Sequence, residues 1–364
     1  MSRPRARQAG IWFGETPAGP KNMITDVAGV KVGHCTMING SGQLKVGQGP
    51  VRTGVTAILP HGRNLFREPV KAAYFDINGC GGLHGSLQIR EFGLIDTPIM
   101  LTNTMSMGIV SEATIRYMLK SNGKAGLTED TIIPIVSECD DSFLNDSRGL
   151  HVKVEHAYAA IEDAKDTVEE GAVGAGTGMT CYDFKGGIGT ASRKLVIAGE
   201  QYTIGALVLS NHGDRNELRI DGVPIGANIP PPPKTRVEQG SIVTLIATDA
   251  PLDARQLGRI ARRTFLGLAA TGFRSHNSSG DIAIAFSTAN IHERTDEERL
   301  LTDQLLQDKD ITPLFCATAD CSEESVINSI FKAETIEGRD GNTSFALPID
   351  KTLELMKAHG RLLR

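Results

Sequence analysis

Short apolar runs rich in β-branched residues alternate along this chain with longer segments of helical periodicity, and this alternation limits the fold more than any other feature. Six runs, bounded mostly by Gly, Pro, Asn or Asp, predict buried strands at residues 55–59, 97–101, 132–136, 204–209, 242–247 and 282–286. Helices are predicted at residues 106–119, 151–169, 253–266, 296–306 and 323–333. Strands and helices mixed along the whole length predict a layered α/β fold.

The bulk composition supports one large domain. Of the 364 residues, 40% are hydrophobic, which is enough to bury a sizeable core. The sequence shows no linker-like stretch, low-complexity tail or internal repeat. Residues 222–234, with four consecutive prolines at 230–233, predict an extended surface loop. We therefore expect residues 1–364 to form a single domain.

The charge pattern argues against nucleic acid and membrane partners. The net charge of −5 and the pI near 6.0 offer no electrostatic attraction for either kind of anionic surface. Arg3, Arg5 and Arg7 form a basic cluster near the N-terminus, but no apolar run of a signal peptide follows them. No span approaches the ~20 apolar residues of a membrane helix. We expect a soluble cytoplasmic protein.

The cysteines predict neither a disulfide framework nor a metal site. Six cysteines lie at positions 35, 80, 139, 181, 316 and 321, and no CxxC pair occurs. In a long chain without an export signal, reduced thiols are expected. Cys316 and Cys321 are the closest pair, but their spacing fits no common zinc site.

A polar, turn-forming loop at residues 274–281 leads directly into the apolar run 282–286 and makes Ser279 a candidate nucleophile. If the Ser278–Ser279 bond were cut, Ser279 would carry both a hydroxyl and a free α-amino group, whose pKa of about 7.7–8.0 suits a base near neutral pH. The alternative is an ordinary turn, because Asn, Ser, Gly and Asp are all common turn residues.

Several further segments, taken together and in order, resemble a known family. They are residues 22–34, 54–60, 101–104, 171–179, 185–193, 279–281, 286–290 and 321–328. The chain resembles the aminopeptidase family that contains the L-aminopeptidase/D-esterase and the β-peptidyl aminopeptidases, and the resemblance covers nearly its whole length. It is this resemblance that favours self-cleavage over an ordinary turn at Ser279.

The resemblance implies a self-processing serine hydrolase that removes N-terminal residues from short peptides, amides or esters through an acyl-enzyme, without a metal or organic cofactor. It implies a four-layer α/β/β/α sandwich similar to that of N-terminal-nucleophile hydrolases, with different strand connectivity. Cleavage would give a large α subunit, residues 1–278, and a small β subunit, residues 279–364. The resemblance also implies a homo-oligomer of such α/β heterodimers.

Three further residues are catalytic candidates. Asn211 ends an apolar strand and matches the asparagine that the family uses as an oxyanion donor, although a simple strand-end turn residue explains it equally well. Its neighbour His212 is expected to be exposed. Ser322 and Glu324 precede an apolar helical face and resemble a helix cap and its acidic first turn. By resemblance they would instead lie beside the nucleophile and orient it.

Glu138, Phe143 and Gly176 are candidates for the substrate pocket. Glu138 opens a carboxylate-rich stretch after a strand, and Gly176 belongs to a glycine string that lets backbone pass close to a core element or a substrate. Phe143 stands where relatives often carry tyrosine. Gly82 stands where the resemblance leads us to expect an acidic residue that holds a substrate ammonium, which weakens the match to a strict aminopeptidase.

Other functions remain open at this point. Amide hydrolases of the same architecture that act on nylon oligomers, and the ornithine acetyltransferases, use threonine as nucleophile, whereas this chain offers serine. A hydrolase with a GxSxG nucleophile elbow is disfavoured because that motif does not occur. A non-processed binding protein that has kept the fold is the alternative from a different functional class.

Overall fold

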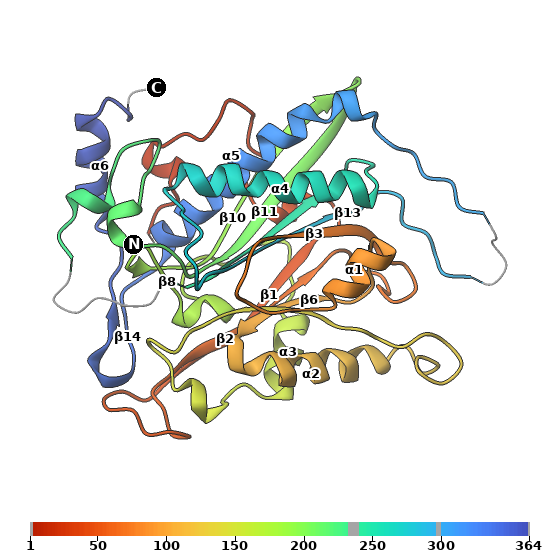
Figure 1. Cartoon of the computed structure of the whole chain (residues 1–364), viewed down its shortest axis with the longest axis horizontal. Helices are drawn as coiled ribbons and strands as arrows, with labels where there is room; N and C mark the ends of the chain where they lie inside the picture. Colours follow the sequence, from red (N-terminus) through yellow and green to blue (C-terminus); the bar gives the residue numbers. More distant parts are fainter. Residues whose placement is uncertain (1–2, 232–239, 296–299, 363–364) are drawn as a thin grey trace.

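Two mixed sheets dominate the computed structural model, which describes residues 3–231, 240–295 and 300–362 (Figure 1). The first sheet has the order β1-β2-β6-β7-β4 and the second the order β10-β11-β12-β13-β3-β5. Only the pairs β6/β7 and β12/β13 are parallel in these two sheets. The strands of the first sheet are Lys31–Asn39, Val51–Leu59, Ile99–Asn103, Ile135–Cys139 and Leu83–His84, and those of the second are Gly187–Ile197, Glu200–Ser210, Ile242–Thr248, Gly280–Ser287, Val70–Gly79 and Leu94–Ile95.

The two sheets bury their facing sides against each other. One cluster of buried side chains joins Leu101 of β6 and Ile135 of β7 to Leu245 of β12 and Ile284 of β13. Successive residues of a strand point to opposite faces, so Ile282, Ile284 and Phe286 face this core while Ala283 and Ala285 face away from it. Strands covered on both faces explain why β12 and β13 are continuous apolar runs.

Helices cover the outer faces of both sheets. Helices α4 (Ala254–Ala270) and α5 (Thr312–Lys332) pack on the six-stranded sheet, and α2 (Met107–Leu119) and α3 (Val154–Glu162) pack on the five-stranded sheet. Figure 1 shows α4 and α5 above the strands and α2 and α3 below them. The mixed α/β fold predicted from the sequence is confirmed.

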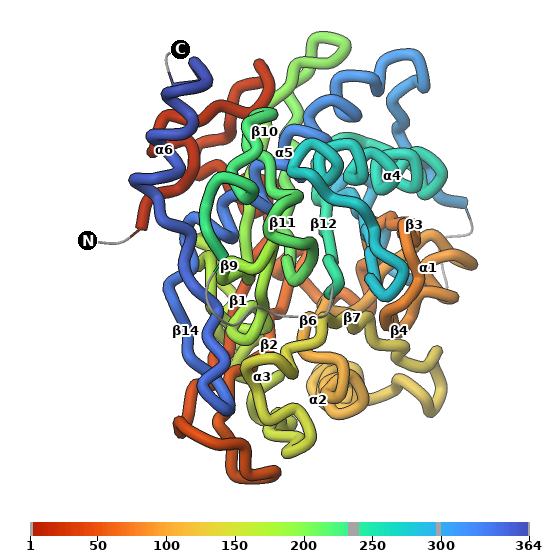
Figure 2. Tube along the Cα trace, turned by 60° about the vertical axis from the view of Figure 1, so that its left-hand side comes forward, coloured from red at the N-terminus to blue at the C-terminus, as the bar shows by residue number. Residues whose placement is uncertain are grey.

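The remaining elements lie at the edges. They are α1 (Ser86–Phe92), α6 (Ile349–Ala358), the hairpin β8/β9 (Thr180–Cys181 and Phe184–Lys185) and the hairpin β14/β15 (Ile336–Glu337 and Thr343–Ser344). Both termini lie on the α6 side of the molecule in Figures 1 and 2. Within the described residues, no helix is long and apolar enough to cross a membrane.

The capping hydrogen bonds at the starts of α4 and α2 show how well the sequence predicted where these helices begin. At the start of α4, Asp253 Oδ1 accepts a hydrogen bond from the Gln256 N–H at 2.6 Å and Gln256 Oε1 accepts one from the Asp253 N–H at 3.1 Å, a capping box at the predicted position. At the start of α2, the cap comes from Asn103 Oδ1, which accepts from the Ser106 N–H, rather than from Ser106 itself.

Several predicted elements are corrected. Helix α3 ends at Glu162 instead of continuing to residue 169, and the strand expected at 132–136 is β7, Ile135–Cys139. Residues 300–306 are not helical, and the rest of the helix predicted at 296–306 lies outside the described residues. The proline-rich loop contains a short 3₁₀ turn, Gly226–Asn228, and its residues 232–234 lie outside the described residues.

Candidate active site

The first residues of β12 and β13 and the last residue of β3 lie together at one edge of the six-stranded sheet. Because β12 and β13 are parallel, Ile242 lies opposite Asp281 and both strands begin at this edge. Strand β3 runs antiparallel to β13, so its last residue, Gly79, lies opposite Gly280. In the other sheet, β6 and β7 are parallel and therefore end together, which gathers Thr104 and Glu138. The fold thus collects loops from both sheets.

A cavity of about 620 Å³ lies where these loops converge. Its lining comes from the β3–β4 connection, the entry to α2, the end of β7, the start of β12 and the loop before β13. The lining residues are Cys80, Gly81, Gly82, Thr104, Met107, Glu138, Asp140, Gly240, Ser241 and Ser278. A concave site with convergent polar groups is the arrangement expected of a small-molecule binding site.

Ser279 lies beside this cavity but is not one of its lining residues. It is only 2% exposed, whereas Ser278 is exposed. The Ser279 hydroxyl lies 2.6 Å from the Gly240 carbonyl oxygen and 2.5 Å from Asp281 Oδ1. Burial raises the pKa of the Asp281 carboxyl, and hydrogen bonds from Ser275 and Ser279 oppose that shift. The single proton of the Ser279 hydroxyl can serve one of these two oxygens at a time, and the Gly240 carbonyl is within its reach.

Ser241, like Ser278, lines the cavity. Its Oγ accepts a hydrogen bond from the Gly280 N–H at 3.0 Å, and its carbonyl oxygen accepts one from the Asn211 N–H at 3.0 Å. Ser241 was not among the residues predicted from the sequence. The available signal was a glycine and a serine directly before the apolar run of β12, a position equivalent to that of Ser279 before β13.

Asn211 lies next to Ser241, at the end of β11. Its Oδ1 accepts from the Thr180 N–H at 2.9 Å and its Nδ2 donates to the Asp140 carbonyl at 2.8 Å, so the side-chain amide is held at both ends. The neighbouring His212 was expected to be exposed, and this is wrong. Its ring is 2% exposed and packs edge-on against Tyr182 and Phe273 in the core.

Glu138 supplies a buried carboxylate to the cavity. Its side chain accepts hydrogen bonds from the Thr104 hydroxyl and, at 2.9 Å, from the Gly82 N–H. Burial raises the pKa of the Glu138 carboxyl above its ordinary value, and the two hydrogen bonds oppose the shift. A Cβ at Gly82 would overlap the Met107 thioether, so the acidic side chain expected at position 82 would require the Met107 side chain to move. Glu138 and Asp140 are the acidic residues that line the cavity.

Ser322 and Glu324 do not lie beside Ser279, which corrects their predicted position. Helix α5 begins at Thr312, so Ser322 is inside it and donates to the Thr318 carbonyl at 2.8 Å instead of capping a helix. Glu324 forms buried ion pairs with Arg193 at 2.8 Å and Arg7 at 2.9 Å.

The strand register places Glu324 far from the cavity. Arg193 of β10 lies opposite Ile204, which lies opposite Thr248, which in turn lies opposite Ser287. Ser287 is the last residue of β13, whereas the cavity is at the first residue, Gly280. Glu324 is therefore at the opposite end of the sheet and serves as a counter-ion for two arginines.

Gly176 and Phe143 are also not among the residues that line the cavity. A Cβ at Gly176 would lie 2.7 Å from the Ile188 nitrogen, so this glycine permits close backbone packing, as one of the two interpretations predicted. The Gly176 carbonyl accepts a hydrogen bond from the Lys185 ammonium at 3.0 Å, and burial lowers the pKa of Lys185 to about 7. Phe143 is half-buried, and its carbonyl accepts from Asn342 Nδ2 at 2.8 Å.

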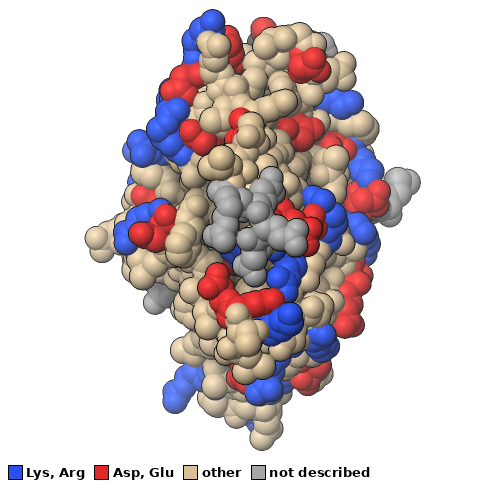
Figure 3. Space-filling model, turned by 90° about the vertical axis from the view of Figure 1, so that its right-hand side faces the viewer, with Lys and Arg blue, Asp and Glu red and all other residues tan. Residues whose placement is uncertain are grey.

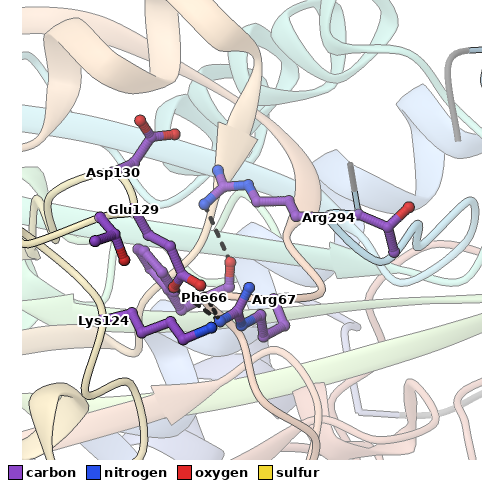
Figure 4. A pocket seen from close by; sticks show the side chains of 8 residues that line it. Phe66, Arg67, Lys124, Glu129, Asp130 and Arg294 are labelled. Carbon is purple, nitrogen blue, oxygen red and sulfur yellow. Dashed lines mark hydrogen bonds and ion pairs between the residues drawn. The ribbon is translucent and has the colours of Figure 1, made fainter. Parts of the chain in front are cut away.

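A second cavity, of about 710 Å³, lies away from this site (Figure 4). Two of its three cationic residues are paired, because Arg67 pairs with Glu129 at 2.6 Å and Arg294 pairs with Asp96 at 3.1 Å. Figure 3 shows that positive and negative side chains alternate over the face that it draws. No large surface of one sign appears on that face to attract a polyanion.

Metal-binding residue types gather at one place in the described part of the chain, at Asp214, Glu217 and His276. His276 Nε2 already bonds to Glu217 at 2.9 Å, and the Arg274 guanidinium lies 4.0 Å from the same carboxylate. We assign this group to an ion-pair cluster that anchors the loop before β13. Cys316 is exposed and Cys321 is buried in α5, where burial raises the pKa of the Cys321 thiol to about 12.

Comparisons with known proteins agree with this geometry. The model of peptidase family S58 matches residues 22–344. The chain is 40% identical to the beta-peptidyl aminopeptidase BapA of Sphingosinicella microcystinivorans over 375 residues, covering 99% of this chain and 93% of the relative.

Two solved structures share the whole fold. One is the PH0078 protein from Pyrococcus horikoshii, with a TM-score of 0.94, 50% identity and coverage of 98% of this chain and 100% of that chain. The other is the L-aminopeptidase D-Ala-esterase/amidase from Ochrobactrum anthropi, described as a prototype for the serine aminopeptidases and a new variant of the Ntn hydrolase fold. It gives a TM-score of 0.93 at 37% identity, covering 99% of this chain and 100% of that chain.

Proposed function

The chain belongs to peptidase family S58 and is a serine-type aminopeptidase, and we propose that it cuts itself between Gly240 and Ser241 to free Ser241 as its N-terminal nucleophile. The observation that carries this proposal is the contact between the Ser279 hydroxyl and the Gly240 carbonyl oxygen at 2.6 Å. A donor at this oxygen stabilises the negative charge that develops there when a nucleophile attacks the Gly240 carbon. Ser241 Oγ is the hydroxyl adjacent to that carbon.

The cleavage proceeds as an acyl shift followed by hydrolysis. Ser241 Oγ attacks the Gly240 carbonyl carbon and forms an ester, while the bond from that carbon to the Ser241 nitrogen breaks. The proton from the hydroxyl ends on the released amine. Water then hydrolyses the ester, which leaves a carboxylate on Gly240 and a free hydroxyl and α-amino group on Ser241.

The same groups then serve substrate hydrolysis. The α-amino group of Ser241, with an ordinary pKa of about 7.7–8.0, takes the proton from its own hydroxyl as that hydroxyl attacks the substrate carbonyl. The amine or alcohol leaving group departs with a proton, and water releases the N-terminal residue from the acyl-enzyme. Asn211 is adjacent to Ser241, and hydrogen bonds with Thr180 and Asp140 hold its side chain. Its side-chain amide is the proposed second hydrogen-bond donor to the oxyanion.

The proposal also covers the chain's organisation and substrates. We infer the four-layer α/β/β/α sandwich from the two facing sheets and their outer helices, with fragments 1–240 and 241–364 in place of the division first predicted before Ser279. The names of its relatives support short peptides, amides and esters with α- or β-amino N-terminal residues as substrates. Assembly of such heterodimers into a homo-oligomer remains a prediction.

A blocked substrate tests the function directly. We expect the protein to hydrolyse L-alanine p-nitroanilide and β-alanine p-nitroanilide, and to hydrolyse N-acetyl-L-alanine p-nitroanilide at least about 100-fold less efficiently in kcat/KM. Acetylation removes the ammonium and leaves the buried Glu138 carboxylate without its proposed partner, which costs several kcal/mol. Equal hydrolysis of blocked and free substrates would contradict an aminopeptidase that recognises the amino group.

The raised pKa of Glu138 predicts a pH dependence. Glu138 must be ionised to hold an ammonium, so kcat/KM is expected to fall as the pH falls through the raised pKa of Glu138, above the ordinary glutamate value. The Ser241 α-amino group, with an ordinary pKa of about 7.7–8.0, must also lose its proton to act as the base, so it contributes to the acidic limb in both proteins. In Glu138→Gln only the contribution of Glu138 should disappear, which makes the limb less steep, while kcat/KM is low at every pH. The pH profiles of kcat/KM for both proteins check this, and a limb of unchanged steepness in Glu138→Gln would mean that Glu138 does not contribute to it.

A further inference from the structure

Three glycines lie where β3 leads into β4: Gly79, the last residue of β3, and Gly81 and Gly82 in the three-residue connection. None of them has a positive φ, so the backbone there does not require glycine. Gly81 and Gly82 line the 620 Å³ cavity together with Cys80. The absence of side chains at Gly81 and Gly82 therefore affects the space inside the cavity and not the backbone conformation.

Gly81 lies between the two groups that the proposed function uses. A Cβ at Gly81 would stand 3.1 Å from the Gly280 Cα and 3.4 Å from Glu138 Oε1. The Gly280 N–H in turn bonds Ser241 Oγ at 3.0 Å. A methyl group at position 81 would thus stand in tight contact with the Gly280 backbone and with the Glu138 carboxylate, beside the path from the nucleophile to that carboxylate.

The N-terminal residue of a substrate must follow that path. Its carbonyl carbon lies at Ser241 and its ammonium at Glu138, if the proposed function holds. An α-amino residue has one carbon between carbonyl and nitrogen, whereas a β-amino residue has two. The second carbon needs room along this path, and Gly81, which has no side chain, leaves that room.

We propose that Gly81 determines specificity by leaving space for the additional backbone carbon of a β-amino N-terminal residue. This inference rests on the proposed function, because it takes Ser241 and Glu138 as the two ends of the bound residue. The neighbouring Gly82 does not have this role, because a Cβ at Gly82 would meet the flexible end of the Met107 side chain and not the path of the substrate.

The variant Gly81→Ala tests the role of Gly81 directly, and Gly79→Ala is its matched control. A Cβ at Gly79 would meet nothing within 4 Å, so that variant adds the same methyl group to the same connection without narrowing the cavity. The kcat/KM values are measured for β-alanine p-nitroanilide and L-alanine p-nitroanilide.

In Gly81→Ala, the ratio of kcat/KM for the β-alanine substrate to that for the L-alanine substrate is expected to fall by about 10-fold or more, the effect of one misplaced methylene. In Gly79→Ala, the ratio should stay at the wild-type value. An unchanged ratio in Gly81→Ala would overturn the inference, as would an equal fall in both variants.

Failure of the inference is distinguishable from failure of the proposed function. Intact mass of each variant reports whether it is cut before Ser241, and each variant is assayed with both anilides. If the wild-type protein hydrolyses neither anilide, the proposed function fails and this inference fails with it. If the wild type hydrolyses both and the ratio does not move in Gly81→Ala, only the role of Gly81 is wrong.

Discussion

Replacing Ser241 by alanine is expected to leave the chain uncut and to lower kcat/KM for L-alanine p-nitroanilide by about 10⁵-fold, the usual effect of removing a nucleophile. Ser241 lines the cavity, and the carbonyl before it accepts the Ser279 hydroxyl. Without the Ser241 hydroxyl, neither the acyl shift nor the acyl-enzyme can form. Intact mass and steady-state kinetics measure the two effects separately.

Ser279→Ala is the matched control for this serine assignment. Because the Ser279 hydroxyl is proposed only to donate to the oxyanion, its removal is expected to slow cleavage and turnover by about 10²–10³-fold while the cut stays before Ser241. If Ser241→Ala were cut before residue 279 and remained active, Ser279 would be the nucleophile, as the sequence pattern first suggested.

Replacing Glu324 by glutamine is expected to destabilise the folded protein by about 3–5 kcal/mol, the cost of leaving a buried charge without its partner. Both Glu324 and Arg193 side chains are 0% exposed, and Arg7 pairs with the same carboxylate. Asn22 Nδ2 also donates to Glu324, at 2.5 Å. Urea unfolding of the uncut Ser241→Ala background, with and without Glu324→Gln, gives the difference in free energy of unfolding.

Glu354→Gln is the control for the ion pair. Glu354 pairs with Lys351 at the surface, with 68% of its side chain exposed, so its replacement is expected to change stability by less than about 1 kcal/mol. Below the unfolding transition, kcat of processed Glu324→Gln should match that of the wild type. A large loss of kcat with unchanged stability would restore the catalytic role that the sequence suggested for Glu324.

The sequence predicted the central strands well because both faces of those strands are covered. In β12 and β13 every residue is buried, which produces the continuous apolar runs that were recognised. Strands β1 and β3, with exposed and polar positions, and the glycine-rich start of β10 gave no such signal and were missed. The helix predicted from residue 323 begins at Thr312, and its first turns, which bury Leu314, Ala317 and Cys321 at helical spacing, were not recognised.

The sequence identified part of the site but could not rank two equivalent serines. Glu138 and Asn211 were both selected, and the fold places Glu138 in the cavity and Asn211 next to Ser241. Ser241 and Ser279 each precede an apolar strand. Only the parallel register of β12 and β13 sets the Ser279 hydroxyl on the Gly240 carbonyl, and register between distant segments is not encoded in either local pattern.

The contacts of the N-terminal arginines could also not be predicted from the sequence, because the tertiary structure creates them. Arg3 donates to the carbonyls of Phe331 and Leu347, and Arg7 pairs with Glu324. A basic cluster at the start of the sequence therefore ties the N-terminal segment to the C-terminal quarter of the chain. These contacts join residues more than 300 positions apart, which no local pattern predicts.

The position of self-cleavage distinguishes Ser241 from Ser279 as the nucleophile. Intact mass under denaturing conditions, followed by N-terminal sequencing of the smaller fragment, is made on freshly purified wild-type protein. We expect two fragments, residues 1–240 and 241–364, with the second beginning Ser-Ile-Val-Thr. A smaller fragment that begins at Ser279, or a single uncut chain of 39.0 kDa, would contradict this expectation.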